Sequence, residues 1–313
     1  MKNVAITGIS GYLGTLFLRR MDRDADVESI IGIDVMPPRV DSPKLKFYSR
    51  DVRSSFADVF AEHKIDTALH LAFQVTPIHD DTGSHSINLE GSSNFLKACE
   101  QVGIRQLFYM SSYTAYGAHA DNPDLLTEDT PLRPNPSMVY PVDKAKVDNM
   151  FQEYMKDHPD SSVVIVRTAA VVGPNIVAGG LTTLFMPVMM RASGHDPLWQ
   201  FIHEDDLVDI VMTLLKKNES GVFNAAADDG MRYTEIIKAM GRPSIALPEG
   251  LMAWGTRLSW KLHLQSRSSG GVEILAYDAV MDNDKVKKAT GHSFKYSGRE
   301  AFMSFLDHLK EVS

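Results

Sequence analysis

Short runs of β-branched and aliphatic residues alternate with longer amphipathic segments through the first half of the chain. Six of these runs predict strands, at residues 4–6, 29–33, 45–48, 67–71, 107–110 and 163–166. Four intervening segments predict helices, at residues 12–21, 56–63, 86–102 and 139–158. Strands that are apolar on both faces and separated by helices form parallel sheets, because right-handed crossovers place helices on each face. We therefore predict an α/β chain with a doubly wound parallel sheet.

The regular alternation ends beyond Arg167. Glycine and proline breaks follow at Gly173-Pro174 and Gly179-Gly180, and a methionine-rich stretch follows them at residues 185–190. Methionine adapts to irregular surfaces, so this stretch could line an apolar pocket. We interpret it instead as a helix whose methionines fill the core.

The last part of the chain predicts a second, smaller unit. One helix at residues 205–217 and one strand at 222–225 predict a return to the sheet, and segments 248–264 and 300–309 predict further helices. We expect residues 1–170 and 204–226 to form the sheet domain. Residues 171–203 and 227–313 are expected to form a smaller, mostly helical subdomain.

The composition excludes several classes of protein. The chain has 313 residues, of which 44% are hydrophobic and 23% charged, and its formal net charge is −8. These values are typical of a folded chain and give no basic surface for a nucleic acid or an anionic membrane, so any anionic ligand must be bound locally. Cys99 is the single cysteine and cannot form an internal disulfide, and residues 1–8 lack the layout of a signal peptide. We therefore expect a cytoplasmic protein with neither a membrane nor a nucleic-acid partner.

Three glycines lie immediately after the first predicted strand and at the start of the first predicted helix. In the segment 7–14, Gly8 permits a tight turn, Gly11 lets the backbone approach a pyrophosphate, and Gly14 allows close packing of helix on strand. The helix that starts here presents backbone N–H groups to an anion. A plain strand-to-helix turn can carry the same glycines, so the pattern needs the support of its context. We interpret it as a Rossmann-type dinucleotide-binding turn to which Ser10, Tyr12 and Leu13 also contribute.

An acidic residue follows at the end of the second predicted strand. Asp34 lies twenty residues after Gly14, where a carboxylate would accept hydrogen bonds from the adenosine ribose hydroxyls and repel a 2′-phosphate. This position favours NAD over NADP as the cofactor. Arg39 is close enough in sequence to bind a 2′-phosphate, so NADP stays open.

A phenol and an ammonium lie four residues apart at the start of the predicted helix 139–158. Tyr140 and Lys144 therefore project from one face of that helix. A phenol is a poor base at neutral pH, and a neighbouring cation lowers its pKa by favouring the phenolate. Ser112, at the end of the fifth predicted strand, could donate a hydrogen bond to a substrate oxygen. The alternative is an ordinary pair on a helix surface; the glycine turn and the serine favour the catalytic interpretation.

These motifs together give a family resemblance over nearly the whole chain. The chain resembles the extended short-chain dehydrogenases/reductases, in particular their NAD-dependent epimerase/dehydratase group. The landmarks occur in family order: residues 7–14, Asp34, 51–53, 70–73, Asn88, 111–117, 140–144, 171–174, 201–206 and 282–285.

The resemblance implies roles that the spacing cannot give. Tyr140 would be the acid/base, Lys144 its partner and a ligand of the nicotinamide ribose, and Ser112 the donor to the substrate oxygen. Asn88 would have a helix-kink or water-relay role, or would be a satisfied buried amide. Further cofactor contacts are implied for Asp51, Val52, Leu71, Ala72, Phe73 and Thr168. Further substrate contacts are expected from Gln74, Thr114, Asn175, Trp199 and Arg267. A homodimer is expected, because the family commonly pairs the helices after Asn88 and around Tyr140.

Several positions depart from the family's nucleotide-sugar members. Trp199 stands where an arginine usually binds the diphosphate, and Ala170 where an asparagine is frequent. Arg267 could be a second diphosphate ligand or a solvated loop charge. Residues 112–114 read Ser-Tyr-Thr where a 4,6-dehydratase would have Thr-Asp-Glu, so dehydration is not expected.

The cluster His203 to Asp206 could suggest a metal site. Consecutive residues do not share a helix face, so we interpret the cluster as a capped helix start whose dipole favours acidic residues. His70 is interpreted as structural, and His79, His85 and His195 have no partner at a recognisable spacing. We predict no metal.

The expected function is NAD-dependent hydride transfer at a secondary alcohol or ketone carbon. An activity like that of a nucleotide-sugar 4-epimerase is the first expectation. The departures keep open a dehydrogenase or reductase of a non-nucleotide hydroxy or keto substrate. A catalytically silent dinucleotide-binding regulator is the third possibility.

Overall fold

A seven-stranded parallel sheet forms the centre of the protein. The computed structural model describes residues 1–75, 81–176, 186–263 and 271–311. Across the sheet the strands are ordered β10 (Gly221–Ala225), β6 (Ser162–Thr168), β5 (Gln106–Ser112), β4 (Thr67–His70), β1 (Asn3–Thr7), β2 (Ser29–Asp34) and β3 (Leu45–Ser49). Every neighbouring pair is parallel. The strand order reverses direction between β1 and β4, the point at which open α/β sheets bind their ligands.

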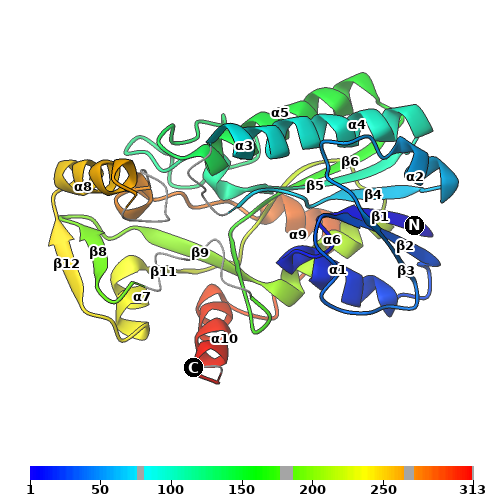
Figure 1. The fold of residues 1–313 in the computed structure, drawn as a ribbon. Coiled ribbons are helices and arrows are strands. Elements are labelled where there is room, and N and C mark those ends of the chain that lie inside the picture. The colour runs from blue at the N-terminus through cyan, green and yellow to red at the C-terminus, as the bar shows by residue number, and fades with distance from the viewer. Residues whose placement is uncertain (76–80, 177–185, 264–270, 312–313) are drawn as a thin grey trace.

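Helices cover both faces of this sheet (Figure 1). One face carries α2 (Ala57–Glu62), α4 (Gly91–Val102) and α5 (Val139–Asp157); the other carries α1 (Tyr12–Asp22), α6 (Glu204–Lys216) and α9 (Asp284–Thr290). A separate hydrophobic cluster fills the space between the sheet and each helical layer. The predicted doubly wound α/β class is therefore confirmed.

The helical segment that leads into α4 starts at Asp81, five residues before the predicted start at residue 86. Helix α3 (Asp81–His85) passes into a π-helical turn, η1 (Ser86–Glu90), which leads directly into α4. Within this stretch the Ser92 hydroxyl donates to the Asn88 carbonyl oxygen at 2.6 Å. π-Helical turns are rare and occur frequently at functional sites.

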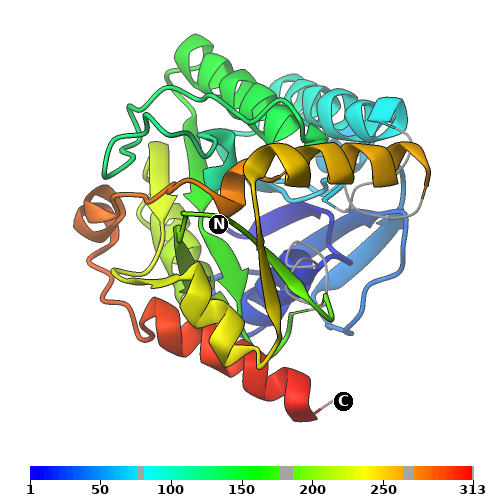
Figure 2. The ribbon, with the colours of Figure 1, turned by 90° about the vertical axis from the view of Figure 1, so that its left-hand side faces the viewer.

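The smaller part of the protein combines two short sheets with helices. Strands β7 (Ala170–Val172), β9 (Leu198–His203) and β11 (Gly230–Arg232) form one sheet, and β8 (Met189–Ala192) pairs with β12 (Ser244–Leu247) in the other. Helices α7 (Tyr233–Ala239), α8 (Glu249–Lys261) and α10 (Gly298–Glu311) pack around a third hydrophobic cluster. Figure 2 shows α8 and α10 on opposite sides of the two small sheets.

The methionine-rich stretch is where the sequence prediction of a helix is wrong. Met189 and Met190 lie in β8, which pairs with β12 in parallel register, Ser244 opposite Met189. The predicted core-filling role is confirmed for Met189, which is fully buried. The strand depends on a partner more than fifty residues away, which local sequence preferences cannot reveal.

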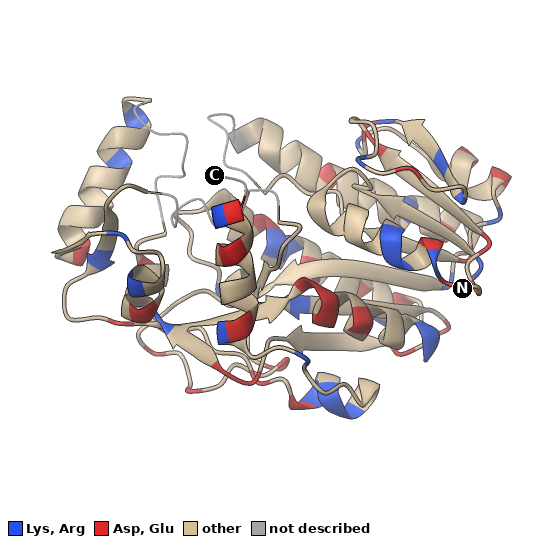
Figure 3. Ribbon diagram, turned by 90° about the horizontal axis from the view of Figure 1, so that it is seen from below, with Lys and Arg blue, Asp and Glu red and all other residues tan. Residues whose placement is uncertain are grey.

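Charged residues are spread over the outside of the molecule. The ribbon of Figure 3 shows the positions of acidic and basic residues interspersed along the helices and loops. None of the helices within the described ranges is long and apolar enough to cross a membrane.

Candidate active site

The carboxyl ends of four adjacent strands bring the predicted site residues together. β1 leads into Gly8, β4 into Leu71, β5 ends at Ser112, and β6 ends at Thr168. Ser112 lies opposite Thr168 in the register of β5 and β6. Parallel strands end at the same edge of a sheet, so these residues line one edge although they span about half of the chain.

The glycine turn has the geometry that its sequence predicts. Gly8 has φ +76°, and a Cβ atom at this position would lie 2.5 Å from the backbone nitrogen of Ala72. A Cβ at Gly14 would lie 2.7 Å from the backbone of Ile9, which explains the close packing of α1 on the turn. Gly11 is the N-cap of α1, and among the described side chains none caps this helix end. The first N–H groups of α1 therefore have no capping side chain among the described residues, as an anion-binding helix start requires.

Asp34 is the last residue of β2 and lies at the same edge of the sheet. Its Oδ2 accepts from the Ser10 backbone N–H at 3.1 Å, and its Oδ1 accepts from the Met36 N–H at 3.1 Å. Each carboxylate oxygen keeps a further lone pair, so ribose hydroxyls could still donate to it. The Arg39 side chain donates to the Ser10 carbonyl oxygen at 2.8 Å, which holds a cation on the same turn.

Asp51 and Val52 lie beyond β3. The Arg53 guanidinium hydrogen-bonds to Asp51 and holds the pKa of that carboxyl below its usual range. Val52 is buried under α4, because Gly91 leaves no Cβ between them.

Ser112 ends β5, and Tyr140 lies near it in the first turn of α5. Ser112 is buried, and its Oγ accepts from both the N–H and the hydroxyl of Thr114, at 3.2 and 2.9 Å. Burial raises the pKa of Tyr140, and a hydrogen bond with the Ser112 side chain lowers it in part. Since Thr114 supplies two donors, the Ser112 hydroxyl proton is available to Tyr140 or to a substrate oxygen.

Lys144 is buried behind this pair. Its ammonium donates to the Met110 carbonyl oxygen at 2.6 Å and lies 3.7 Å from the centroid of the Phe73 ring. It is also 5.8 Å from the centroid of the Tyr140 ring. Burial lowers the pKa of Lys144 to about 7, so its charge changes near neutral pH.

Asn88 connects the sheet to the helix that carries Tyr140. Its Oδ1 accepts from the Gln74 N–H at 2.7 Å, and its Nδ2 donates to Asp143 at 2.9 Å. Its backbone oxygen accepts from Ser92, whose hydroxyl also meets His70 at 2.9 Å. Burial, with a smaller contribution from the Lys144 charge, lowers the pKa of His70 to about 3, so His70 is neutral and structural here.

The sequence prediction missed the partner of His85. Its Nδ1 lies 2.5 Å from Asp143 Oδ1, although the two residues are 58 positions apart. The one signal in the sequence is Asp143 itself, an acidic residue in the predicted helix that the Tyr140 and Lys144 spacing does not require. His195 likewise meets Glu249 at 3.0 Å. His79 lies outside the described residues.

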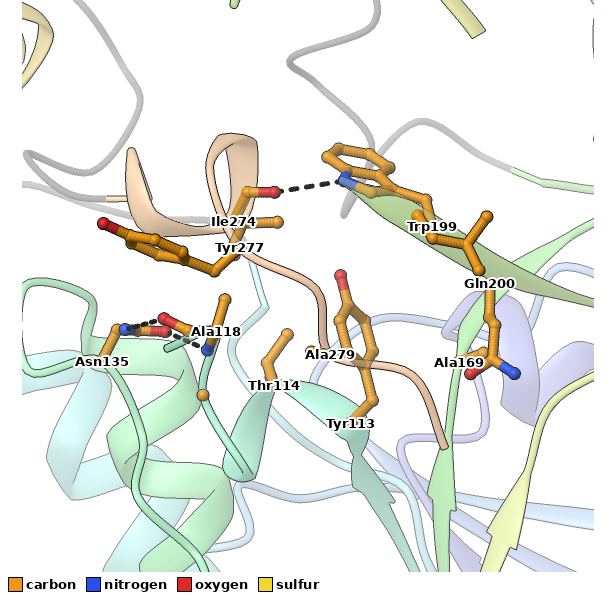
Figure 4. Close-up of a pocket in the computed structure, with 12 residues that line it drawn as sticks. Tyr113, Thr114, Ala118, Asn135, Ala169, Trp199, Gln200, Ile274, Tyr277 and Ala279 are labelled. Carbon is orange, nitrogen blue, oxygen red and sulfur yellow. Dashed lines mark hydrogen bonds between the residues drawn. The ribbon is translucent and has the colours of Figure 1, made fainter. Parts of the chain in front are cut away.

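A pocket is lined in part by Tyr113 and Ala169, the residues that follow Ser112 and Thr168 in the chain (Figure 4). Tyr113, Thr114 and Ala169 line its base, and Trp199, Ile274 and Tyr277 line its walls. The cavity volume of this pocket is about 20 Å³. The Trp199 indole donates to the Ile274 carbonyl oxygen at 3.1 Å. Burial raises the pKa of Tyr113 to about 12, so its phenol is neutral. No charged side chain is among the described residues that line this pocket.

One expected substrate contact, Asn175, lies elsewhere. Asn175 is not in this pocket: its backbone N–H donates to the Glu204 carboxylate at 3.2 Å, and its side-chain oxygen accepts from Arg19 at 2.8 Å. The Tyr12 hydroxyl donates to the same carboxylate. Burial and the Glu204 charge raise the pKa of Tyr12. Arg267 lies outside the described residues.

The acidic cluster at the end of β9 forms the start of a helix. His203 is the N-cap of α6 and its ring accepts from the Asp205 N–H at 3.2 Å, as the capped-helix interpretation predicts. Within the described part of the chain no group of three or more His, Cys, Asp or Glu side chains is placed to hold a metal ion.

The residues at this edge fit a dinucleotide. The uncapped start of α1 and the close approach of Gly8 to the Ala72 backbone suit a pyrophosphate. Asp34, at the end of β2, suits a ribose. Over residues 4–226 the chain matches the NAD dependent epimerase/dehydratase family. The chain belongs to this family. The resemblance drawn from the sequence is thereby confirmed, and so is the expectation of an NAD-dependent enzyme.

Similar proteins cover nearly the full chain. An uncharacterised protein of Mycobacterium tuberculosis is 25% identical, with 96% of this chain and 82% of that protein aligned. A UDP-glucose 4-epimerase of Lactobacillus helveticus is 24% identical, with 82% and 91% aligned. The solved structure of dTDP-glucose 4,6-dehydratase from Bacillus anthracis in complex with NAD has a TM-score of 0.75 and 16% identity, and it covers 99% of this chain and 97% of that one. At this identity the structural likeness shows the shared fold.

Proposed function

We propose that this protein transfers hydride between NAD and a secondary alcohol or ketone carbon, with Ser112, Tyr140 and Lys144 as its catalytic residues. The observation that carries the proposal is their arrangement. Tyr140 lies near enough to Ser112 for that side chain to lower its pKa, and the Lys144 nitrogen lies buried 5.8 Å from the centroid of the Tyr140 ring. The glycine turn and Asp34 lie along the same sheet edge.

Each side chain has a separate task in this proposal. Ser112 donates to the substrate oxygen, because Thr114 already occupies its acceptor sites. Tyr140 accepts the alcohol proton, or returns a proton to a ketone, and the Lys144 ammonium favours its phenolate form. NAD, when bound, supplies the carbon that accepts or donates the hydride. In an epimerase the ketone would be reduced again on its other face.

The Tyr140→Phe variant tests this assignment. Loss of the acid/base should lower the rate of hydride transfer by about 10²–10⁴-fold, while NADH binding stays close to that of the wild type. Nicotinamide absorbance measures the rate, and NADH fluorescence measures binding. Transfer at the wild-type rate would refute the acid/base role of Tyr140.

A nucleotide sugar is the first substrate candidate. The support is the family and relatives such as the UDP-glucose 4-epimerase of L. helveticus. A 4,6-dehydratase activity is disfavoured, since residues 112–114 supply hydroxyls without the acidic pair that this reaction would use.

The pocket supports a second candidate. Diphosphate binding needs cations, whereas the described lining is uncharged and places the Trp199 indole on its wall. A hydroxy or keto substrate without a nucleotide would fit such a lining. A silent NAD-binding regulator is disfavoured, because Ser112, Tyr140 and Lys144 are all present and lie near one another.

A substrate panel separates these candidates. The protein would be incubated with nucleotide sugars and with simple alcohols, each with NAD and with NADP. Epimerisation of a UDP- or dTDP-sugar without net NADH formation would support the first candidate. Net NADH formation from a non-nucleotide alcohol would support the second, and NAD binding without turnover of any compound would support the regulator.

A further inference from the structure

A fully buried carboxylate lies directly beside the proposed catalytic pair. Asp143 precedes Lys144 on α5, follows Tyr140 by three residues, and has no exposed side-chain area. Within the described ranges no Lys or Arg pairs with it; its partners are His85 Nδ1 at 2.5 Å and Asn88 Nδ2 at 2.9 Å. Burying an ionised carboxylate costs several kcal/mol unless its oxygens are hydrogen-bonded. The spacing of Tyr140 and Lys144 does not itself require a charge at this position.

The carboxylate determines how the Asn88 amide is oriented. An ionised carboxylate can only accept hydrogen bonds, so the Asn88 NH₂ group must face Asp143. The Asn88 oxygen is then directed at the Gln74 N–H, which it meets at 2.7 Å. Asn88 therefore joins α5 to the backbone that follows β4.

This backbone carries the ring on which Lys144 rests. Phe73, next to Gln74, lies 3.7 Å from the Lys144 ammonium, measured to the ring centroid. The same ring meets Tyr140 edge to face, at 5.7 Å between centroids and an interplanar angle of 90°. A chain of contacts therefore runs from Asp143 through Asn88 to Phe73, and Phe73 contacts both Tyr140 and Lys144.

We propose that Asp143 is a positioning residue which, with His85, fixes the Asn88 amide and so holds Phe73 against Tyr140 and Lys144. This inference rests on the proposed function of that pair. Asp143 acts through Asn88 and touches neither the substrate nor the cofactor.

Two variants of Asp143 separate positioning from simple burial. Asp143→Ala removes both acceptor oxygens and leaves the Asn88 amide with only the hydrogen bond from the Gln74 N–H to orient it. Asp143→Asn keeps the shape: its oxygen can accept from Asn88, and its NH₂ can donate to His85 in the tautomer with an unprotonated Nδ1. The alanine variant should therefore lose the positioning, and the asparagine variant should retain most of it.

Asp206 offers a matched control. It is also fully buried, on α6, and it meets His292 at 3.0 Å and accepts from the Lys295 and Tyr296 N–H groups. Asp206→Ala removes a comparable buried acceptor far from Phe73. It should lower thermal stability without changing the proposed site.

The experiment measures NADH binding by fluorescence, and kcat and KM for a turned-over substrate, at a temperature well below every variant's unfolding midpoint. Asp143→Ala should weaken NADH binding about tenfold and lower kcat about tenfold with a smaller change in KM. Asp143→Asn should stay within about threefold of the wild type in both, and Asp206→Ala should match the wild type.

The outcomes distinguish this inference from the proposed function. NADH binding and kcat of Asp143→Ala that equal those of Asp206→Ala would show that Asp143 is only structural. An Asp143→Asn variant as impaired as Asp143→Ala would also contradict the argument from the amide. Failure of the wild-type protein to bind NADH would instead refute the proposed function, and the positioning role with it.

Discussion

At the scale of single residues, Lys144 holds its amino group between aromatic rings and a backbone carbonyl oxygen. The Phe73 and Tyr109 rings lie 3.7 and 4.9 Å from its nitrogen, and Met110 accepts its hydrogen bond. Burial lowers the pKa of Lys144 from the ordinary 10.5 to about 7. The sequence predicted that this residue lies beside Tyr140, but its burial comes from the packing of α5 on β5.

This pKa predicts how stability depends on pH. Between pH 7 and 10.5 the unfolded chain holds a proton on Lys144 that the folded protein has largely lost, so this group makes the free energy of unfolding rise with pH. Lys144→Met lacks that contribution. The stability of the wild type relative to the variant should therefore grow as pH rises from 7 to 10, as measured by urea unfolding at each pH. A constant difference would show that the folded protein keeps Lys144 protonated, with a pKa close to that of the unfolded chain.

At the scale of elements, a buried ion pair joins α5 to β6. Arg167 donates to both oxygens of Asp148, at 3.0 and 2.9 Å, and both side chains are almost fully buried. Arg167 also donates to the Tyr116 hydroxyl and to the Glu128 carbonyl oxygen. This cluster fixes α5 to the sheet one turn after Lys144.

Replacing one member of this ion pair should destabilise the protein more than replacing both members. Asp148→Leu leaves the Arg167 guanidinium buried without its carboxylate and should lower the free energy of unfolding by about 3–5 kcal/mol. The double variant Asp148→Leu/Arg167→Met removes both charges and should recover a large part of that loss. Denaturant unfolding of the two single variants and the double variant measures the coupling. Additive effects in this cycle would contradict a direct interaction.

At the scale of the whole molecule, the proposed NAD site draws on the ends of several strands and therefore exists only in the folded chain. A ligand that binds only the folded state raises the free energy of unfolding, by about 2.7 kcal/mol at a ligand concentration 100 times its Kd. The unfolding midpoint rises as a result. NAD should therefore raise the midpoint. NADP at equal concentration should raise it less, because the Asp34 carboxylate at the end of β2 repels a 2′-phosphate. Thermal scans measure both, and a larger shift with NADP would indicate that Arg39 decides the preference instead.

Three expectations about the whole molecule stay predictions. They are the homodimer, the division at residues 170, 204 and 226, and the cytoplasmic location. Light scattering in solution tests the first. The mixture of polar and charged residues on the outer face of α5, with Lys146, Asn149 and Glu153 exposed, gives that face no continuous apolar surface.

The sequence by itself determined the doubly wound sheet, the glycine turn, Asp34 and the spacing of Tyr140 and Lys144. These features depend on neighbours within a few residues, where periodicity and backbone geometry act directly. The tertiary structure decided the pairing of His85 with Asp143, the place of Asn175 beside Glu204, and the pocket that joins Tyr113 to Trp199 and Tyr277. Such contacts join residues far apart in the chain. They arise only when helices pack on the sheet and fix which side chains become buried together.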